Sequence, residues 1–243
     1  MLRRLNPELK LFLGAYLLYN IGRWVTAGDI GPATDNARWI VDLESTLGIG
    51  IERSVQDGLQ GGVSMSLLSH IYLAAQLLVV PGVLVHLYKK APAIYRRLRD
   101  TVLATWLISI PVYAVFPVAP PRLAGIGIAD TVSTHGAVSM TGRSSVFYNE
   151  LAAVPSLHCG FAVAVGIALA AAADRRLTKA LALLWGPLVC LTVVATGNHY
   201  VFDIAGGLAA ALAGYAIGAL LRRPRSAPAP VLGRGLVAGS EAA

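Results

Sequence analysis

Apolar runs of membrane-spanning length alternate with short polar segments along this chain. A helix needs about 20 mainly apolar residues to cross the hydrocarbon core of a bilayer. Six runs approach this length, at residues 9–25, 64–88, 101–118, 155–173, 180–196 and 201–221. The pattern therefore predicts an all-helical integral membrane protein, built as a bundle of six transmembrane helices.

The segment 28–62, between the first two predicted spans, follows a different pattern. It is rich in acidic residues, and its apolar residues recur at helical spacing. This apolar stripe consists of Trp39, Ile40, Leu43, Leu47, Ile51, Val55 and Leu59. We expect one or two amphipathic helices here, lying on the membrane surface or on the bundle.

Two further segments lack a spanning pattern. Residues 120–153 form a loop long enough to be either functional or disordered. Residues 223–243 are rich in proline, alanine and glycine, which predicts a disordered tail. The membrane-embedded domain is therefore expected to cover residues 1–222.

The composition excludes an ordinary soluble protein. Apolar residues make up 56% of the chain and charged residues 14%, whereas about 25% charged residues are typical of a soluble domain. The net charge of +7 does not indicate a nucleic-acid partner, because most cations lie in short clusters between apolar runs. Cys159 and Cys190 fall within apolar runs and lack the spacing of a disulfide framework or a metal site.

The cation clusters also predict the orientation in the membrane. They precede the first span, at Arg3, Arg4 and Lys10, and follow the second, fourth and sixth, within residues 89–99, 175–179 and 222–225. With six spans, all of these clusters lie on one side, which the positive-inside rule assigns to the cytoplasm. We therefore expect a plasma (inner) membrane protein with both termini and the tail in the cytoplasm. The extracytoplasmic side then receives residues 28–62, 120–153 and 197–200.

Two stretches on that outer side each place a histidine at the mouth of an apolar run. In residues 151–158, Pro155 is favoured at the first position of a helix, and Ser156 with the free N–H groups near it predicts an anion site at the helix start. In residues 198–203, His199 and Asp203 are four apart and share a helix face. Asp203 would then orient the His199 imidazole. Together with His158, this constellation indicates phosphoryl chemistry through a histidine nucleophile.

These residues resemble a known family. The run Pro-Ser-Leu-His at residues 155–158 resembles the second signature of the type 2 phosphatidic acid phosphatase superfamily, and His199 with Asp203 resembles the end of the third. More narrowly, the inositolphosphotransferase branch, which includes inositol phosphorylceramide synthases, is similar at residues 116–122, 152–158, 199–203 and 43–52. The resemblance covers roughly residues 10–220.

The resemblance implies a role for each matching residue. His199 would attack phosphorus and form a phosphohistidine, and Asp203 would orient and stabilise it. His158 would protonate the leaving oxygen and then act as base for the acceptor. Ser156 and its neighbouring N–H groups would bind phosphate oxygens, with Arg122 as the arginine of the first signature. The scheme requires no metal and no cofactor.

The sequence departs from the family pattern at two cations. The position of the first-signature lysine is Val115, and the Ser-Arg pair ahead of the third-signature histidine is Thr192 and Val193. Arg143, in the long loop, is a candidate replacement, and Asn198 and Tyr200 are candidates for neutral hydrogen bonds to the substrate. A less cationic site favours a phosphodiester monoanion over a phosphomonoester dianion.

The predicted function is a membrane phosphotransferase that acts on lipid phosphate esters and transfers a phosphoryl or phosphoalcohol group, with residues 1–222 as the catalytic domain. Its substrates would be phospholipids or polyprenyl phosphates, among the other lipids of the membrane. One alternative is a lipid phosphate or polyprenyl diphosphate phosphatase, with water as acceptor. An alternative of another class is a non-catalytic scaffold or transporter. The sequence leaves the lipid donor, the acceptor and the oligomeric state open.

Overall fold

The structure is a computed structural model that describes residues 7–25, 29–135 and 151–222. Within these ranges the chain is helical and contains no β-strand, only one isolated bridge. A π-helical turn, Ala75–Val79, joins α4 and α5 into one helical segment. The helices are α1 (Pro7–Val25), α2 (Ile30–Leu47), α3 (Glu52–Gly58), α4 (Gly62–Ala74), α5 (Val80–Lys90), α6 (Pro92–Val115), α7 (Thr131–His135), α8 (Leu157–Ala172), α9 (Arg176–Ala195) and α10 (Val201–Leu221).

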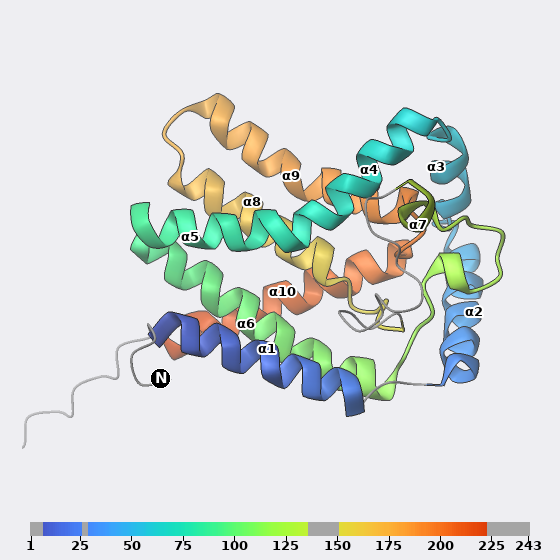
Figure 1. Cartoon of the computed structure of the whole chain (residues 1–243), viewed down its shortest axis with the longest axis horizontal. Coiled ribbons are helices and arrows are strands. Elements are labelled where there is room, and N and C mark those ends of the chain that lie inside the picture. Colours follow the sequence, from blue (N-terminus) through green and yellow to red (C-terminus); the bar gives the residue numbers. More distant parts are fainter. Residues whose placement is uncertain (1–6, 26–28, 136–150, 223–243) are drawn as a thin grey trace, which may run out of the picture.

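The longer helices form a bundle whose two ends differ. Helices α1, α4 with α5, α6, α8, α9 and α10 run along the long axis of the molecule (Figure 1). Helices α2, α3 and α7 gather at one end of this bundle, on the right in Figure 1. The connections α5–α6 and α8–α9 and the C-terminal end of α10 lie at the opposite end. Residues 29–62 of the predicted amphipathic segment therefore cover one end of the bundle, as the sequence pattern predicts.

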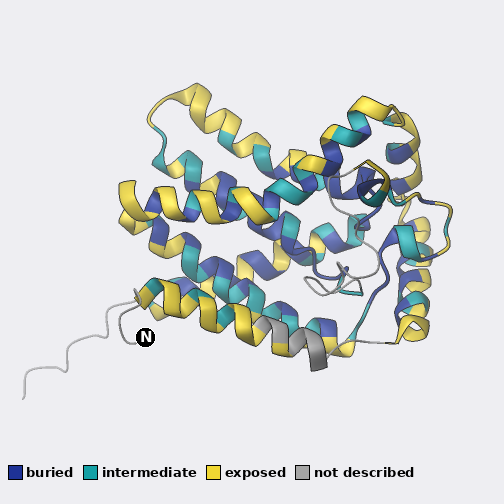
Figure 2. Cartoon of the chain, in the orientation of Figure 1, coloured by how far each residue is buried: buried dark blue, intermediate teal, exposed yellow. Residues whose placement is uncertain are grey.

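Four helical segments are long and apolar enough to cross a membrane: Gly62–Lys90, Pro92–Val115, Arg176–Ala195 and Val201–Leu221. Their outward faces are largely exposed, as Figure 2 shows in yellow, and many of the exposed residues are large and apolar. Helix α8 is apolar but has only 16 residues. Helix α1, which carries Glu8 and Lys10 in its first turns, is not among the four. The all-helical class is confirmed, whereas the count of six spans is not.

The start of α8 differs from the prediction. Pro155 does not occupy the first helical position, because the helix begins at Leu157 with Ser156 as its extended N-cap residue. The Ser156 hydroxyl accepts a hydrogen bond from the Cys159 N–H at 3.3 Å. A serine oxygen satisfies one of the free N–H groups of a helix start. The cap is therefore Ser156, and Pro155 lies outside the helix.

The buried face of α2 is not the predicted apolar stripe. Within that stripe Ile40 is buried, but Trp39 and Leu47 are exposed. The face that packs inward carries Ala33, Ala37, Ile40 and Glu44. Small side chains allow the backbone to come close, and the Ala119 N–H donates to the Ala33 carbonyl at 3.0 Å. Close backbone approach, rather than side-chain size, selects this face.

Glycines bring the long helices into direct backbone contact. A Cβ atom on Gly160 of α8 would lie 2.7 Å from the Gly207 carbonyl of α10. A Cβ atom on Gly214 of α10 would lie 2.9 Å from the Thr101 carbonyl of α6. Small residues are typical of such contacts between membrane helices. The first contact brings the starts of α8 and α10 together, and the second brings α10 against α6.

The long loop has some structure where it is described. Residues Pro121–Leu123 form a 3-10 turn, and α7 follows at Thr131. The remainder of the predicted loop, residues 136–150, and the predicted tail, residues 223–243, lie outside the described residues. The assignment of residues 223–243 to a disordered tail, separate from domain 1–222, stays a prediction.

Candidate active site

Three motifs that are distant in sequence meet where α8 and α10 begin: the first at residues 116–122, the second at 152–158 and the third at 199–203. The Ser156 N–H donates to the Asp203 carbonyl at 3.1 Å, which joins the second motif to the third. The Arg122 N–H donates to the Gly197 carbonyl at 3.0 Å, which joins the first motif to the third. A parallel bridge pairs Val118 with Ala152, which joins the first motif to the second. Main-chain hydrogen bonds therefore fix the relative positions of all three.

His199 and Asp203 form a buried pair at the start of α10. His199 Nδ1 lies 3.1 Å from Asp203 Oδ2, and the Tyr200 N–H donates to the same oxygen at 2.9 Å. Because Oδ2 already accepts from Tyr200, it is an acceptor for the ring as well. Nδ1 therefore carries the proton and Nε2 keeps its lone pair. The predicted contact is present, although His199 precedes the helix.

The surroundings of His199 keep its ring neutral. Burial, together with the positive charge of Arg122, lowers the pKa of His199 to about 3, against a smaller opposing effect of the Ala153 backbone. A buried imidazole resists protonation because the charged form loses hydration. At neutral pH the Nε2 lone pair is therefore available without prior loss of a proton.

His158 faces this pair from the first turn of α8. The ring centroids of His158 and His199 are 6.0 Å apart, with the planes inclined at 55°. The His158 ring also stacks on Tyr72 of α4, with the centroids 4.2 Å apart and an interplanar angle of 17°. Tyr72 therefore restrains the plane of the imidazole. No pattern in the sequence singles out this tyrosine, because it resembles any aromatic residue in an apolar run.

The start of α8 offers hydrogen-bond donors beside the two rings. Ser156 satisfies the Cys159 N–H, but within the described residues the N–H groups of Leu157 and His158 have no acceptor. The helix dipole adds a partial positive charge at the same place. The helix start is therefore suited to an anion.

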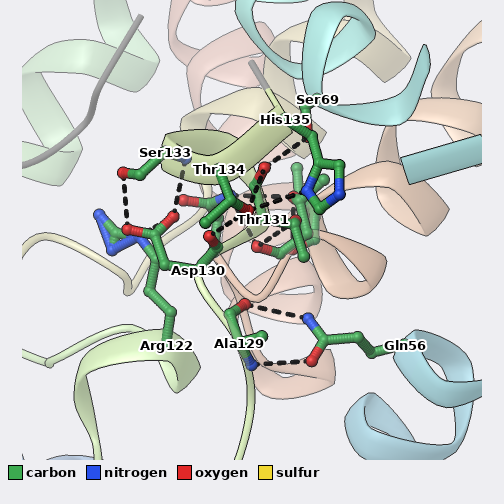
Figure 3. A network of polar contacts seen from close by, with 12 residues as sticks. Gln56, Ser69, Arg122, Ala129, Asp130, Thr131, Ser133, Thr134 and His135 are labelled. Atoms are coloured by element: carbon green, nitrogen blue, oxygen red, sulfur yellow. Dashed lines mark hydrogen bonds and ion pairs between the residues drawn. The ribbon is translucent and has the colours of Figure 1, made fainter. Parts of the chain in front are cut away.

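Arg122 is a buried cation with unused hydrogen-bond donors. Its side chain is 3% exposed, and its Nε and Nη1 atoms have no hydrogen-bond partner. The nearest charge is Asp130, whose Oδ1 lies 3.7 Å from Nε, too far for a good hydrogen bond. Figure 3 shows that Asp130 bonds instead to the N–H and hydroxyl groups of Ser133. Unpaired buried donors are costly, so the guanidinium is suited to an incoming anion.

Two of the predicted substrate-binding residues support the frame of the site. The Asn198 amide donates to the Thr196 carbonyl and hydroxyl, at 3.3 and 2.9 Å, within the turn that carries His199. The Tyr200 hydroxyl donates to the Ala119 carbonyl at 3.1 Å. Arg143 lies outside the described residues. The predicted direct roles of all three in substrate binding remain untested.

The two positions where the family pattern has cations hold valines. Val115, at the lysine position, is 81% exposed at the end of α6, and Val193, at the arginine position, is buried in α9. Thr192, at the serine position, is buried, and its hydroxyl donates to the Leu188 carbonyl at 2.7 Å. Over the described part of the chain, no three His, Cys, Asp or Glu side chains group so as to hold a metal ion.

Comparison with known proteins yields one match. A family model of the PAP2 superfamily matches residues 38–217, which include the C-terminal part of α2 and every described residue of the candidate site. No curated protein and no solved structure matches the chain. Members of this superfamily are phosphatases or phosphotransferases that act on phosphate esters, which supports an enzyme. The match covers most of the chain, and the motifs it spans meet in one place, so the protein belongs to the PAP2 superfamily.

Proposed function

We propose that this protein is a membrane phosphotransferase that acts on lipid phosphate esters through a phosphohistidine at His199. One observation carries the proposal: His199 is held through Nδ1 by Asp203, and the His158 ring lies 6.0 Å away on another helix. Reacting or proton-sharing atoms need to be about 3 Å apart. A phosphoryl group between the two rings would touch both of them.

In the first half-reaction, the Nε2 lone pair of His199 attacks phosphorus and forms a P–N bond. The bond between phosphorus and the leaving alcohol oxygen breaks, and its electron pair stays on that oxygen. His158, which takes up a proton when the substrate anion lies beside it, donates that proton to the departing oxygen, so the alcohol leaves neutral. Asp203 stabilises the positive charge that develops on the His199 ring.

In the second half-reaction, the neutral His158 takes a proton from the hydroxyl group of the acceptor. The acceptor oxygen attacks phosphorus, the P–N bond breaks, and its electron pair returns to His199 Nε2. Both histidines regain their starting protonation states. Arg122 and the N–H groups of Leu157 and His158 stabilise the charge of the phosphoryl oxygens in each step.

The charge of the site favours a phosphodiester donor that carries a headgroup. Val115, Thr192 and Val193 add no cation, and Arg122 is the described cation that acts on the pKa of His199. A phosphodiester monoanion needs less compensation than a monoester dianion. The phosphoalcohol group would then stay on His199 while diacylglycerol leaves, as expected for the inositolphosphotransferase branch.

Trapping the covalent intermediate tests this function. Detergent-solubilised protein would be mixed with phosphatidate or phosphatidylinositol, each radiolabelled at phosphorus, and quenched under alkaline conditions that preserve phosphohistidine. We expect phosphatidylinositol to label the protein, and His199→Ala to reduce labelling to below about one-thousandth. His86→Ala, which changes an exposed histidine of α5, is the matched control and should label normally.

A second label distinguishes the alternatives. With a tritiated inositol headgroup, phosphoalcohol transfer places both labels on the protein, whereas hydrolysis of a phosphomonoester labels it from phosphatidate alone. The latter result would favour the lipid phosphatase. Normal labelling of His199→Ala would contradict the histidine nucleophile.

A further inference from the structure

Two buried glutamates hold the start of α10, and the proposed reaction does not use them. Glu44 at the end of α2 is 1% exposed, and Glu52 at the start of α3 is 6% exposed. The Phe202 N–H donates to Glu44 Oε1 at 2.6 Å, and the Val201 N–H donates to Glu52 Oε1 at 2.9 Å. These contacts join residues more than 140 positions apart in the chain.

Together with Asp203, the two glutamates occupy the N–H groups of Tyr200, Val201 and Phe202 at the start of α10. Tyr200 donates to Asp203, and Val201 and Phe202 donate to Glu52 and Glu44. The start of α10 is thus closed to a substrate anion, unlike the start of α8. Negative groups stabilise a helix N-terminus, so the three carboxyl groups fix the backbone that carries His199.

The two carboxyl groups accept from the adjacent N–H groups of Val201 and Phe202, so they lie close together, and a hydrogen bond between them is among the causes that raise the pKa of Glu44. Ionised carboxylates only accept hydrogen bonds, so this contact requires one proton between the two side chains. We propose that Glu44 and Glu52 are positioning residues that share one proton and clamp the first turn of α10, so that His199 stays aligned with His158. This inference rests on the proposed role of His199.

The surroundings of the pair favour retention of the shared proton. Burial raises the pKa of Glu44 to about 8, and the carboxyl groups of Glu52 and Asp203 contribute in the same direction, against the hydrogen bond from Phe202. Burial raises the pKa of Tyr200, and the negative charges of the same three acids act in the same direction. Arg53 of α3 is exposed and lies 3.9 Å from Asp57, so its cation pairs on the surface.

The pKa of Glu44 in the folded protein lies above its ordinary value, and this sets the direction in which pH affects the clamp. The clamp is complete at neutral pH and is lost as the pH rises through about 8, when two buried carboxylates would repel each other. The Glu44→Gln variant keeps the hydrogen bonds of this side chain, but glutamine does not titrate. Its amide oxygen accepts from Phe202, and its NH₂ group donates to Glu52 at any pH.

The test is a pH–rate profile of transfer from phosphatidylinositol, whose phosphodiester does not titrate in the alkaline range. We expect the wild-type kcat to fall above about pH 8, and Glu44→Gln to remain active there. Glu44→Ala should lower kcat roughly 10- to 100-fold with little change in KM, because a small misplacement of a catalytic group has that effect. Asp42→Asn, at an exposed acid on the same helix, should keep the wild-type profile.

Hydrogen exchange provides a readout that does not depend on turnover. In Glu44→Ala, the peptide covering residues 197–205 should exchange faster than in the wild type, whereas in Glu44→Gln it should not. A fall in kcat above about pH 8 in both the wild type and Glu44→Gln would overturn the proposed clamp. A Glu44→Ala variant with normal kcat and normal exchange would do the same. Transfer that survives in His199→Ala would instead overturn the proposed function.

Discussion

At the scale of single residues, Arg122 is the strongest test of where the phosphate binds. Its buried Nε and Nη1 atoms have no hydrogen-bond partner, so they are suited to binding an anion. We expect Arg122→Gln to lower kcat/KM roughly 100-fold, because it removes charged donors from a site of developing charge. Arg122→Lys should recover part of this loss, since lysine retains the charge without the two-pronged geometry.

The matched control is Arg53→Gln, which removes an exposed arginine of α3. Initial rates measured over a range of phosphatidylinositol concentrations would separate the effect on KM from that on kcat. Equal rates for Arg122→Gln and Arg53→Gln would show that the guanidinium of Arg122 does not contact the substrate.

The sequence predicts the site residues best where spacing alone implies contact. The separation of His199 and Asp203 implies a shared face, and their side chains are 3.1 Å apart. Neither Tyr72 nor Glu44 and Glu52 could be assigned a role in this way. Their contacts depend on how α4, α2 and α3 pack against helices far along the chain, and no local pattern encodes that packing.

At the scale of elements, the contact between α8 and α10 depends on one glycine. A Cβ atom on Gly207 would overlap the Ser156 carbonyl, which is backbone and has little freedom to move. We expect Gly207→Ala to destabilise the protein by roughly 1–3 kcal/mol, as overpacking typically does. It should also reduce activity, because the shift would reach the start of α8 beside His158.

The adjacent glycine is a close control. A Cβ atom on Gly206 would lie 3.4 Å from the Pro155 Cβ atom, an ordinary contact. Thermal unfolding in one detergent would compare Gly206→Ala and Gly207→Ala with the wild type. A Gly207→Ala variant as stable as Gly206→Ala would mean that the two helix starts have room to separate.

The helices were predictable from hydrophobic periodicity, but their limits and faces were less so. The last predicted span coincides with α10, because arginines end it sharply. Helix α6 instead begins at Pro92, well before the apolar run, since its first turns are charged yet helical. In α2, the inward face carries two alanines beside Ile40 and leaves Trp39 exposed, because backbone contact with residue 119 outweighs side-chain burial there.

At the scale of the whole molecule, charge separates the two ends of the bundle. The described basic clusters lie at the end formed by the α5–α6 and α8–α9 connections and Arg222, opposite to the candidate site. This arrangement supports the proposed orientation, with the site outside the cytoplasm. The sequence alone predicted the sidedness but not the depth of the site, which depends on helix length.

Cysteine labelling in intact cells tests this orientation. A membrane-impermeant maleimide should react with a cysteine placed by Asp57→Cys at the site end, and with one placed by Lys90→Cys only after permeabilisation. Both positions are exposed, and the wild-type protein, with buried Cys159 and half-buried Cys190, sets the background. The reverse pattern would place the candidate site in the cytoplasm.

The shortness of α8 bears on how a lipid would reach the two histidines of the candidate site. At 1.5 Å per residue, its 16 residues extend about 24 Å, less than the roughly 30 Å of bilayer hydrocarbon. If its C-terminal end sits at the cytoplasmic boundary, His158 lies below the outer headgroup plane. A donor would then be drawn inward by a few ångströms while its acyl chains remain among those of its neighbours. A site recessed in this way would hold little bulk water. Transfer to an alcohol embedded in the same leaflet would then be favoured over transfer to water.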